Sequence, residues 1–86
     1  MKELEKQMKA LANARRLAIL KYLKKNHHAS VGDIAEEIRL SFKSTSRHLS
    51  VLYAAGILEK EKKSLTVLYS LGKTIPKVSR GVIITL

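Results

Sequence analysis

Residues 30–56 read SVGDIAEEIRLSFKSTSRHLSVLYAAG, two helical patterns joined by a short break. The first pattern opens at Ser30, whose hydroxyl stands three residues before Asp33 in the spacing of a capping box, although aspartate is shorter than the usual glutamate. Apolar residues then recur at helical intervals and predict a helix of about eight residues. Its inward face comprises Val31, Ile34, Ala35 and Ile38.

The second pattern begins after Ser41, a side chain suited to cap a free backbone N–H, and we expect a helix over residues 42–55. Gly56 stands where a left-handed residue ends a helix. The buried stripe at i, i+4 and i+7 is Thr45, Leu49 and Leu52, with Val51 and His48 on its margins. Two helices separated by a turn of roughly three residues have the outline of a helix-turn-helix.

Two strand-like runs follow at residues 57–62 and 65–71, on either side of Lys63 and Ser64. Apolar residues alternate in the second run, which is the period of a half-buried strand. They are Leu65, Val67, Tyr69 and Leu71. Because an isolated hairpin is only marginally stable, we expect it to pack on the helices. The predicted fold is therefore a winged helix-turn-helix, mainly α with a small β-hairpin.

Two further helices precede this unit. Residues 1–12 carry a stripe at i, i+4 and i+7, made of Leu4, Met8 and Leu11. Asn13 is placed to cap the next helix, which ends in the basic stretch Lys24-Lys25-Asn26. We assign its buried face to Leu17, Leu20 and Leu23, with Ile19 at the margin.

The tail, residues 73–86, fits two structures. Thr74-Ile75-Pro76 suits a helix start, and a helical stripe follows from it. That stripe is Ile75, Val78, Val82 and Leu86. The β-branched run from Val82 to Thr85 and the interior Gly81 favour a strand instead. We expect a short helix.

Composition restricts the class of protein. The chain has 86 residues and no cysteine, which excludes disulfides, thiolate metal sites and cysteine nucleophiles, and fits a cytoplasmic setting. No linker, repeat or apolar run of membrane-spanning length occurs, and the charged N-terminus is unlike a signal peptide. We therefore expect one domain over residues 1–86, with no membrane association.

The net charge of +10 indicates a polyanionic partner. The helix over residues 42–55 contains no acid, and its side opposite the buried stripe is basic and hydroxyl-rich. That side carries Lys43, Ser44, Ser46, Arg47 and Ser50. Arginine and lysine can bond to N7 and O6 of guanine in the major groove, and the N–H groups after Ser41 can hold a phosphate. The alternative is an ordinary solvated helix face.

The hairpin offers a second set of cations, Lys60, Lys62 and Lys63. They could lie along a DNA backbone or enter the minor groove. Alternatively, they protect a sheet edge, since Glu59 and Glu61 alternate with them.

Nothing in the chain argues for catalysis. His27, His28 and His48 have no acid or second histidine at a helical spacing that would build a metal site. There is no Ser/His/Asp order and no glycine-rich phosphate loop. We expect neither an enzyme nor a cofactor or metal.

Several runs resemble the ArsR-type (arsenic-repressor-like) winged-helix regulators. They are KALANARRLAIL at 9–20, DIAE at 33–36, STSRHLSVL at 44–52, AGILE at 55–59 and VLYSL at 67–71. The resemblance implies a homodimeric transcriptional repressor on a pseudo-palindromic DNA operator, with the two recognition helices roughly 34 Å apart. Carried over by position, the DNA contacts would be Lys43, Ser44, Ser46 and Arg47.

The resemblance also implies that the first and last helices form the dimer interface. Residues 1–12 and 73–86 would then bury apolar side chains that a lone subunit leaves exposed. These side chains are Leu4, Met8, Leu11, Ile75, Val78 and Val82.

The chain departs from the family pattern at several positions. The metal-sensing cysteine pair would fall at Ser30 and Gly32, and no residues after Leu71 match the second metal site. Arg39 and Ser64 stand where glycine is frequent, at a cost of about 1 kcal/mol each if a positive φ is retained.

Phe42 replaces a polar residue at the start of the recognition helix. It could meet a thymine methyl or pack on the preceding helix, and we expect packing.

A second function keeps the same fold. The basic face could serve a winged-helix adaptor that binds RNA or an acidic protein. A membrane-surface role is disfavoured because the helices bury their apolar faces in each other and lack tryptophan anchors.

Overall fold

The helix-turn-helix is formed by α3 (Val31–Ile38) and α4 (Phe42–Ala54), within a computed structural model that describes residues 1–86. The other elements are α1 (Lys2–Leu11), α2 (Ala14–Asn26), β1 (His28–Ser30), β2 (Leu58–Lys63), β3 (Thr66–Leu71) and α5 (Lys77–Thr85). The winged helix-turn-helix architecture is thus confirmed. None of the helices is both long and apolar enough to cross a membrane.

Three helix starts are set by the predicted side-chain caps. Asn13 Oδ1 accepts the N–H of Arg16, and Ser30 Oγ accepts that of Asp33, both at 3.1 Å. Ser41 Oγ accepts the N–H of Ser44 at the same distance. Each bond satisfies a backbone donor that a helix start leaves free, so the bounds of α2, α3 and α4 follow from local sequence.

The ends of α3 and α4 share one geometry. Arg39 has φ 55° and Gly56 has φ 78°, both in the left-handed region. The N–H of Leu40 bonds back to the carbonyl of Ala35, and that of Ile57 to Leu52, the long bond of a Schellman motif. Ser64 at the hairpin turn also has a positive φ, of 59°. Arg39 and Ser64, which stand where the family frequently has glycine, therefore keep the left-handed backbone conformation without a glycine.

The sheet has three antiparallel strands in the order β1-β3-β2. Strand β1 was not predicted, because three residues between two helices carry no pattern of their own. It exists through its pairing with β3, in the register Ala29 opposite Tyr69. The hairpin of β2 and β3 was predicted, and Lys63 pairs with Thr66 at its tip.

Expectations about side-chain burial in α2 and in the hairpin are wrong. Ile19 is fully buried at the centre of the core, whereas Leu17 is only half-buried. Leu65 is 96% exposed, because it lies in the turn of the hairpin and not in the strand that was assigned to it. The other alternating residues of that run, Val67, Tyr69 and Leu71, lie in β3 and pack in or against the hydrophobic core.

The tail is a helix, as expected, but its buried face differs from the predicted stripe. Ser79 and Ile83 are buried, while Val78 is 44% exposed. The Ser79 hydroxyl donates to Gln7 Oε1 of α1 at 3.0 Å, so a polar residue can occupy an interior position. Lys24 Nζ donates to the carbonyl of Ile84 and ties α5 to α2 as well.

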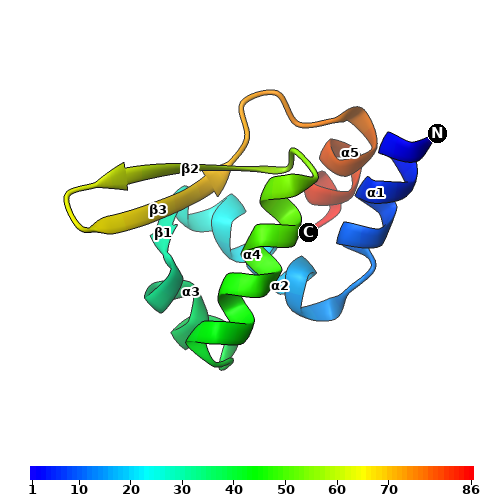
Figure 1. Ribbon diagram of the computed structural model, residues 1–86. Helices are drawn as coiled ribbons and strands as arrows, with labels where there is room; N and C mark the ends of the chain where they lie inside the picture. Colours follow the sequence, from blue (N-terminus) through cyan, green and yellow to red (C-terminus); the bar gives the residue numbers. More distant parts are fainter.

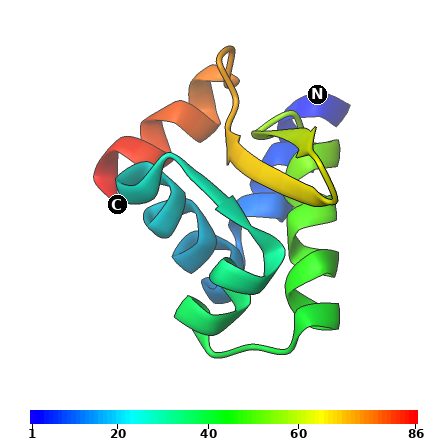
Figure 2. The same cartoon turned by 90° about the vertical axis from the view of Figure 1, so that its left-hand side faces the viewer.

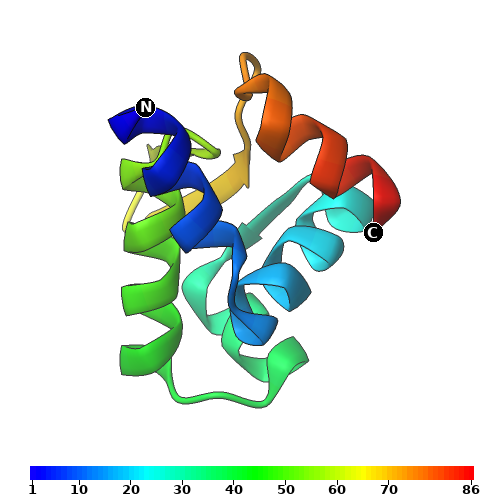
Figure 3. The ribbon, with the colours of Figure 1, turned by 90° about the vertical axis from the view of Figure 1, so that its right-hand side faces the viewer.

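The hairpin, helix α4, and the pair of helices α1 and α5 lie in three different parts of the molecule (Figure 1). The hairpin projects from one end of the molecule, and α1 and α5 lie at the other (Figure 1). Figure 3 shows α1 and α5 on the same side of the chain. Helix α4 stands between these ends, with its first turn beside the loop from α3 (Figure 2).

Candidate nucleic-acid interface

Helix α4 presents its basic side to solvent. Lys43, Arg47 and Ser50 are exposed, and Ser44 and Ser46 are half-buried. The opposite side holds Thr45, Leu49 and Leu52, none of which has any exposed surface. Ser41 is exposed at the cap, next to the free backbone N–H groups of the first turn. The helix therefore offers donors, and no carboxylate, along one open side.

Phe42 is 63% exposed, whereas the expectation was that it packs on the preceding helix. Helix α3 stops at Ile38, and the chain passes through left-handed Arg39 and extended Ser41 before α4 begins. A loop separates the end of α3 from the first turn of α4 (Figure 2). An aromatic ring is thus left in solvent beside Lys43.

The wing lysines differ in their surroundings. Because side chains alternate along a strand, Lys60 and Lys62 lie on the face of β2 that also carries buried Leu58, whereas Lys63 lies on the other. Lys60 Nζ sits 4.4 Å from the ring centroid of Tyr53 on α4, a cation–π contact. Lys63 pairs with exposed Glu61 at 3.8 Å. Lys62 makes no ion pair, so its ammonium is free on the side of α4.

Arg16, which sequence reasoning did not single out, links the end of α1 to α4. Its Nε donates to the carbonyl of Ala10 at 2.6 Å and its Nη2 to that of Lys9 at 3.1 Å. Its Nη1 lies 3.1 Å from Nδ1 of His48 on α4. Three donors of one guanidinium thus hold the end of α1 against α4. No local pattern could reveal the link to α4, because His48 lies 32 residues from Arg16 in the sequence.

The contact also determines the charge of His48. Arginine only donates, so Nδ1 must accept and the imidazole must be neutral, with its proton on Nε2. Burial lowers the pKa of His48, and the nearby charges of Arg16, Arg47 and Arg15 lower it further. His48 therefore positions α4 as an acceptor and adds no cation to its surface.

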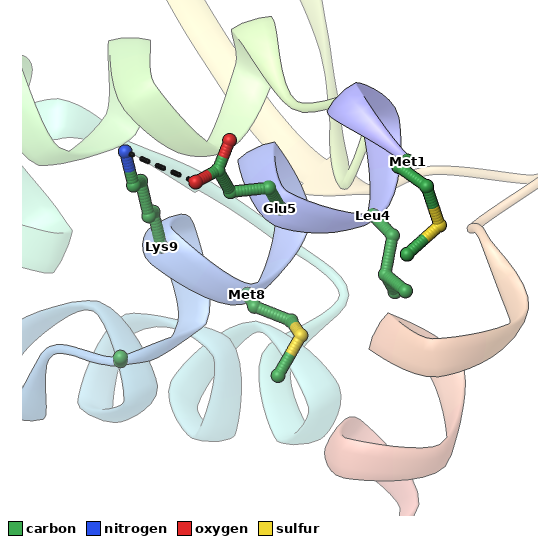
Figure 4. A pocket seen from close by; sticks show the side chains of 6 residues that line it. Met1, Leu4, Glu5, Met8 and Lys9 are labelled. Carbon is green, nitrogen blue, oxygen red and sulfur yellow. Dashed lines mark ion pairs between the residues drawn. The ribbon is translucent and has the colours of Figure 1, made fainter.

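A separate apolar surface covers α1 and α5. Met1, Leu4 and Met8 point away from the Glu5–Lys9 ion pair, along one side of α1 (Figure 4). An adjoining hollow of about 250 Å³ has only apolar walls. Its lining residues are Met8, Leu11, Ala12, Leu17, Val78 and Val82.

The six residues predicted for the dimer interface are unequally accessible. Met8 is 56% exposed and Val78 is 44% exposed. Leu4, Ile75 and Val82 are half-buried. Leu11 is 6% exposed and belongs to the hydrophobic core of the chain.

The remaining histidines do not assemble with other ligands. His27 and His28 are exposed at the junction of α2 and β1. Nowhere in the chain do three or more histidine, aspartate or glutamate side chains gather as a metal site would require.

Comparison with known proteins agrees with this architecture. A family model described as "Bacterial regulatory protein, arsR family" matches residues 13–60. The transcriptional activator HlyU of Vibrio cholerae is 40% identical over 67 residues, which cover 78% of this chain and 61% of HlyU. The transcriptional repressor SdpR of Bacillus subtilis is 36% identical over 67 residues, or 78% of this chain and 73% of SdpR.

Solved structures match over nearly the whole chain. The structure of HlyU from Vibrio cholerae has a TM-score of 0.82 at 32% identity, covering 98% of this chain and 88% of that one. NolR from Sinorhizobium fredii has a TM-score of 0.83 at 27% identity, covering 98% and 80% respectively. The family match includes the caps, both helices of the helix-turn-helix and the start of the wing. This chain belongs to the arsR family of bacterial regulatory proteins.

Proposed function

We propose that this chain is a sequence-specific DNA-binding transcriptional repressor that acts as a homodimer on a pseudo-palindromic operator. Helix α4 enters the major groove, and the β2–β3 wing lies on the backbone or in the minor groove. The observation that carries the proposal is the open side of α4, where Lys43 and Arg47 stand among hydroxyls with no acid on the helix.

The residues divide by task. Arg47 and Lys43 read base edges, because they combine charge with exposure near the start of α4. The short side chains of Ser44, Ser46 and Ser50 let the backbone of α4 approach the DNA. Their hydroxyls form hydrogen bonds to phosphates or bases. Ser41 sits at the helix N-terminus, which favours a phosphate. Lys62 supplies the main wing contact, while Lys60 and Lys63 contribute less because Tyr53 and Glu61 already engage them.

The apolar surface of α1 and α5 is the proposed dimer surface. Met8, Val78 and the hollow between them would be buried against the same residues of a second subunit. A dimer would also place one α4 in each of two half-sites about one DNA turn apart.

Repression, the finer part of the proposal, follows the role in the name of SdpR, whereas HlyU is named an activator. A reporter gene placed behind an operator, itself selected from a random pool of DNA duplexes, tests whether the protein represses or activates transcription. Lower expression with the protein than without it supports repression, and higher expression contradicts it.

Binding itself is tested by gel shifts at about 150 mM salt with duplex DNA, RNA and an acidic polypeptide. We expect a discrete complex with duplex DNA that excess RNA or polypeptide does not remove. Equal or tighter binding to RNA or to the acidic polypeptide would instead support the adaptor function.

A further inference from the structure

Phe42 is the one aromatic side chain exposed in the first turn of α4. The other exposed large apolar residues of α4 are Val51 and Tyr53, in its second half, and Lys60 covers the Tyr53 ring. Phe42 has no such cover and is 63% exposed. The ring therefore lies at the end of α4 from which a helix-turn-helix takes most of its base contacts.

The direction of the side chain strengthens this placement. Side chains on a helix tilt toward its N-terminus, so Phe42, as the first residue, extends toward whatever the end of α4 approaches. Ser46 lies four residues on and shares its side of the helix, and Lys43 is adjacent. By the same spacing Phe42 also neighbours buried Thr45, so its ring lies at the margin between the buried stripe and the open side, in the first turn of α4.

The major groove offers such a ring one apolar partner, the C5-methyl group of thymine. Other base edges present hydrogen-bond donors and acceptors that phenylalanine cannot satisfy. Contact with a methyl group removes apolar surface of both partners from water, which is favourable and confined to thymine.

We propose that Phe42 is a specificity-determining residue that reads a thymine methyl group in each half-site of the operator. The proposal rests on the proposed DNA-binding function. It assigns to an aromatic residue a preference that Arg47 and Lys43, as donors to guanine, cannot supply.

The test uses the operator selected from a random duplex pool, with each thymine replaced in turn by deoxyuridine, which lacks only the methyl group. Wild-type protein should lose affinity roughly fourfold at one position in each half-site, the value of about one buried methyl group. The variant Phe42→Ala should bind both duplexes equally, and Phe42→Leu should keep part of the difference. Because Phe42 is exposed, both variants should retain the melting temperature of the wild type.

Leu65→Ala is the matched control. It also removes an exposed apolar side chain, but from the wing, which the proposed function places on the backbone or in the minor groove, so the deoxyuridine penalty should remain in full. Lys43→Ala should weaken binding to the thymine and deoxyuridine duplexes by the same factor.

Two results would overturn the inference. If deoxyuridine has no effect at any position, or if Phe42→Ala keeps the wild-type penalty, Phe42 reads no methyl group although the protein still selects DNA. If the pool yields no preferred sequence at all, the proposed function fails together with the inference. The selection step therefore distinguishes the two failures.

Discussion

Arg47 is the residue on which base selectivity should depend most. It is exposed on the open side of α4, and its guanidinium can bond to guanine at both N7 and O6. We expect Arg47→Ala to weaken operator binding by about 1–3 kcal/mol and to relax the preference at one base pair. Competition binding with single-base operator variants measures both effects. An unchanged profile would show that Arg47 does not contact a base.

His48 gives the stability of the fold a dependence on pH. The folded-state pKa lies below the ordinary value of 6.5, so the unfolded chain binds more protons between the two values. The contribution of neutral His48 is therefore complete above about pH 6.5 and is lost as the pH falls through the folded pKa. Urea unfolding from pH 8 to pH 5 should show this decrease.

His48→Asn is the control for this effect, because an amide oxygen can accept from Arg16 but does not titrate. Its stability should lack the His48 component of the pH dependence. Identical pH profiles for wild type and variant would contradict the proposed role of the Arg16 contact.

At the scale of the element, the two helix ends of the helix-turn-helix make opposite predictions. Arg39 bears a side chain in a left-handed conformation, so Arg39→Gly should raise the free energy of unfolding by up to about 1 kcal/mol. Gly56→Ala should lower it by about 1 kcal/mol through backbone strain alone, since an added Cβ would meet nothing within 4 Å. Urea titration measures both, and a loss of stability in Arg39→Gly would contradict this assignment.

The wing should contribute affinity without sequence preference. Lys62 is free on the side of α4, so Lys62→Ala should weaken binding to all duplexes alike. It should also reduce the slope of log affinity against log salt by about 0.9 per subunit. Lys63→Ala, whose partner Glu61 already engages it, should change the slope less. A change in base preference for Lys62→Ala would contradict this prediction, because it would mean that the wing contacts base edges.

Most elements were predictable because their signals are local. The caps at Asn13, Ser30 and Ser41 each set a helix start within three residues of sequence. What escaped prediction depends on contacts distant in the chain. Ser79 is interior because Gln7 reaches it from α1, and β1 is a strand because β3 lies beside it.

The candidate interface was predictable to a similar degree. Periodicity alone separates the buried stripe of α4 from its basic side. It does not reveal that Phe42 stays in solvent, because this depends on how the turn after α3 carries the chain. The link from Arg16 to His48 joins residues 32 apart and has no sequence signal.

At the scale of the whole molecule, the apolar surface of α1 and α5 should hold two subunits together. Met8→Asp places a charge in this surface, so we expect the mass in solution to fall from twice the chain mass of 9.6 kDa to that of one chain. Operator affinity should fall with it, because the two half-sites are no longer bound together. Sedimentation equilibrium measures the mass.

The control is Leu65→Asp, which alters an even more exposed apolar side chain, 96% against 56% for Met8, in the turn of the wing, away from α1 and α5. This variant should remain a dimer. A Met8→Asp protein of unchanged mass and DNA affinity would rule out this surface as the subunit contact.

Selection of bound sequences from a random duplex pool tests most directly whether the open side of α4 reads DNA. The wild type should enrich one pseudo-palindromic sequence whose half-site centres lie about 10 base pairs apart, and Arg47→Ala should enrich it poorly or lose one position. A pool that shows no enriched sequence, or the same enrichment with and without the Arg47 guanidinium, would contradict that role for α4.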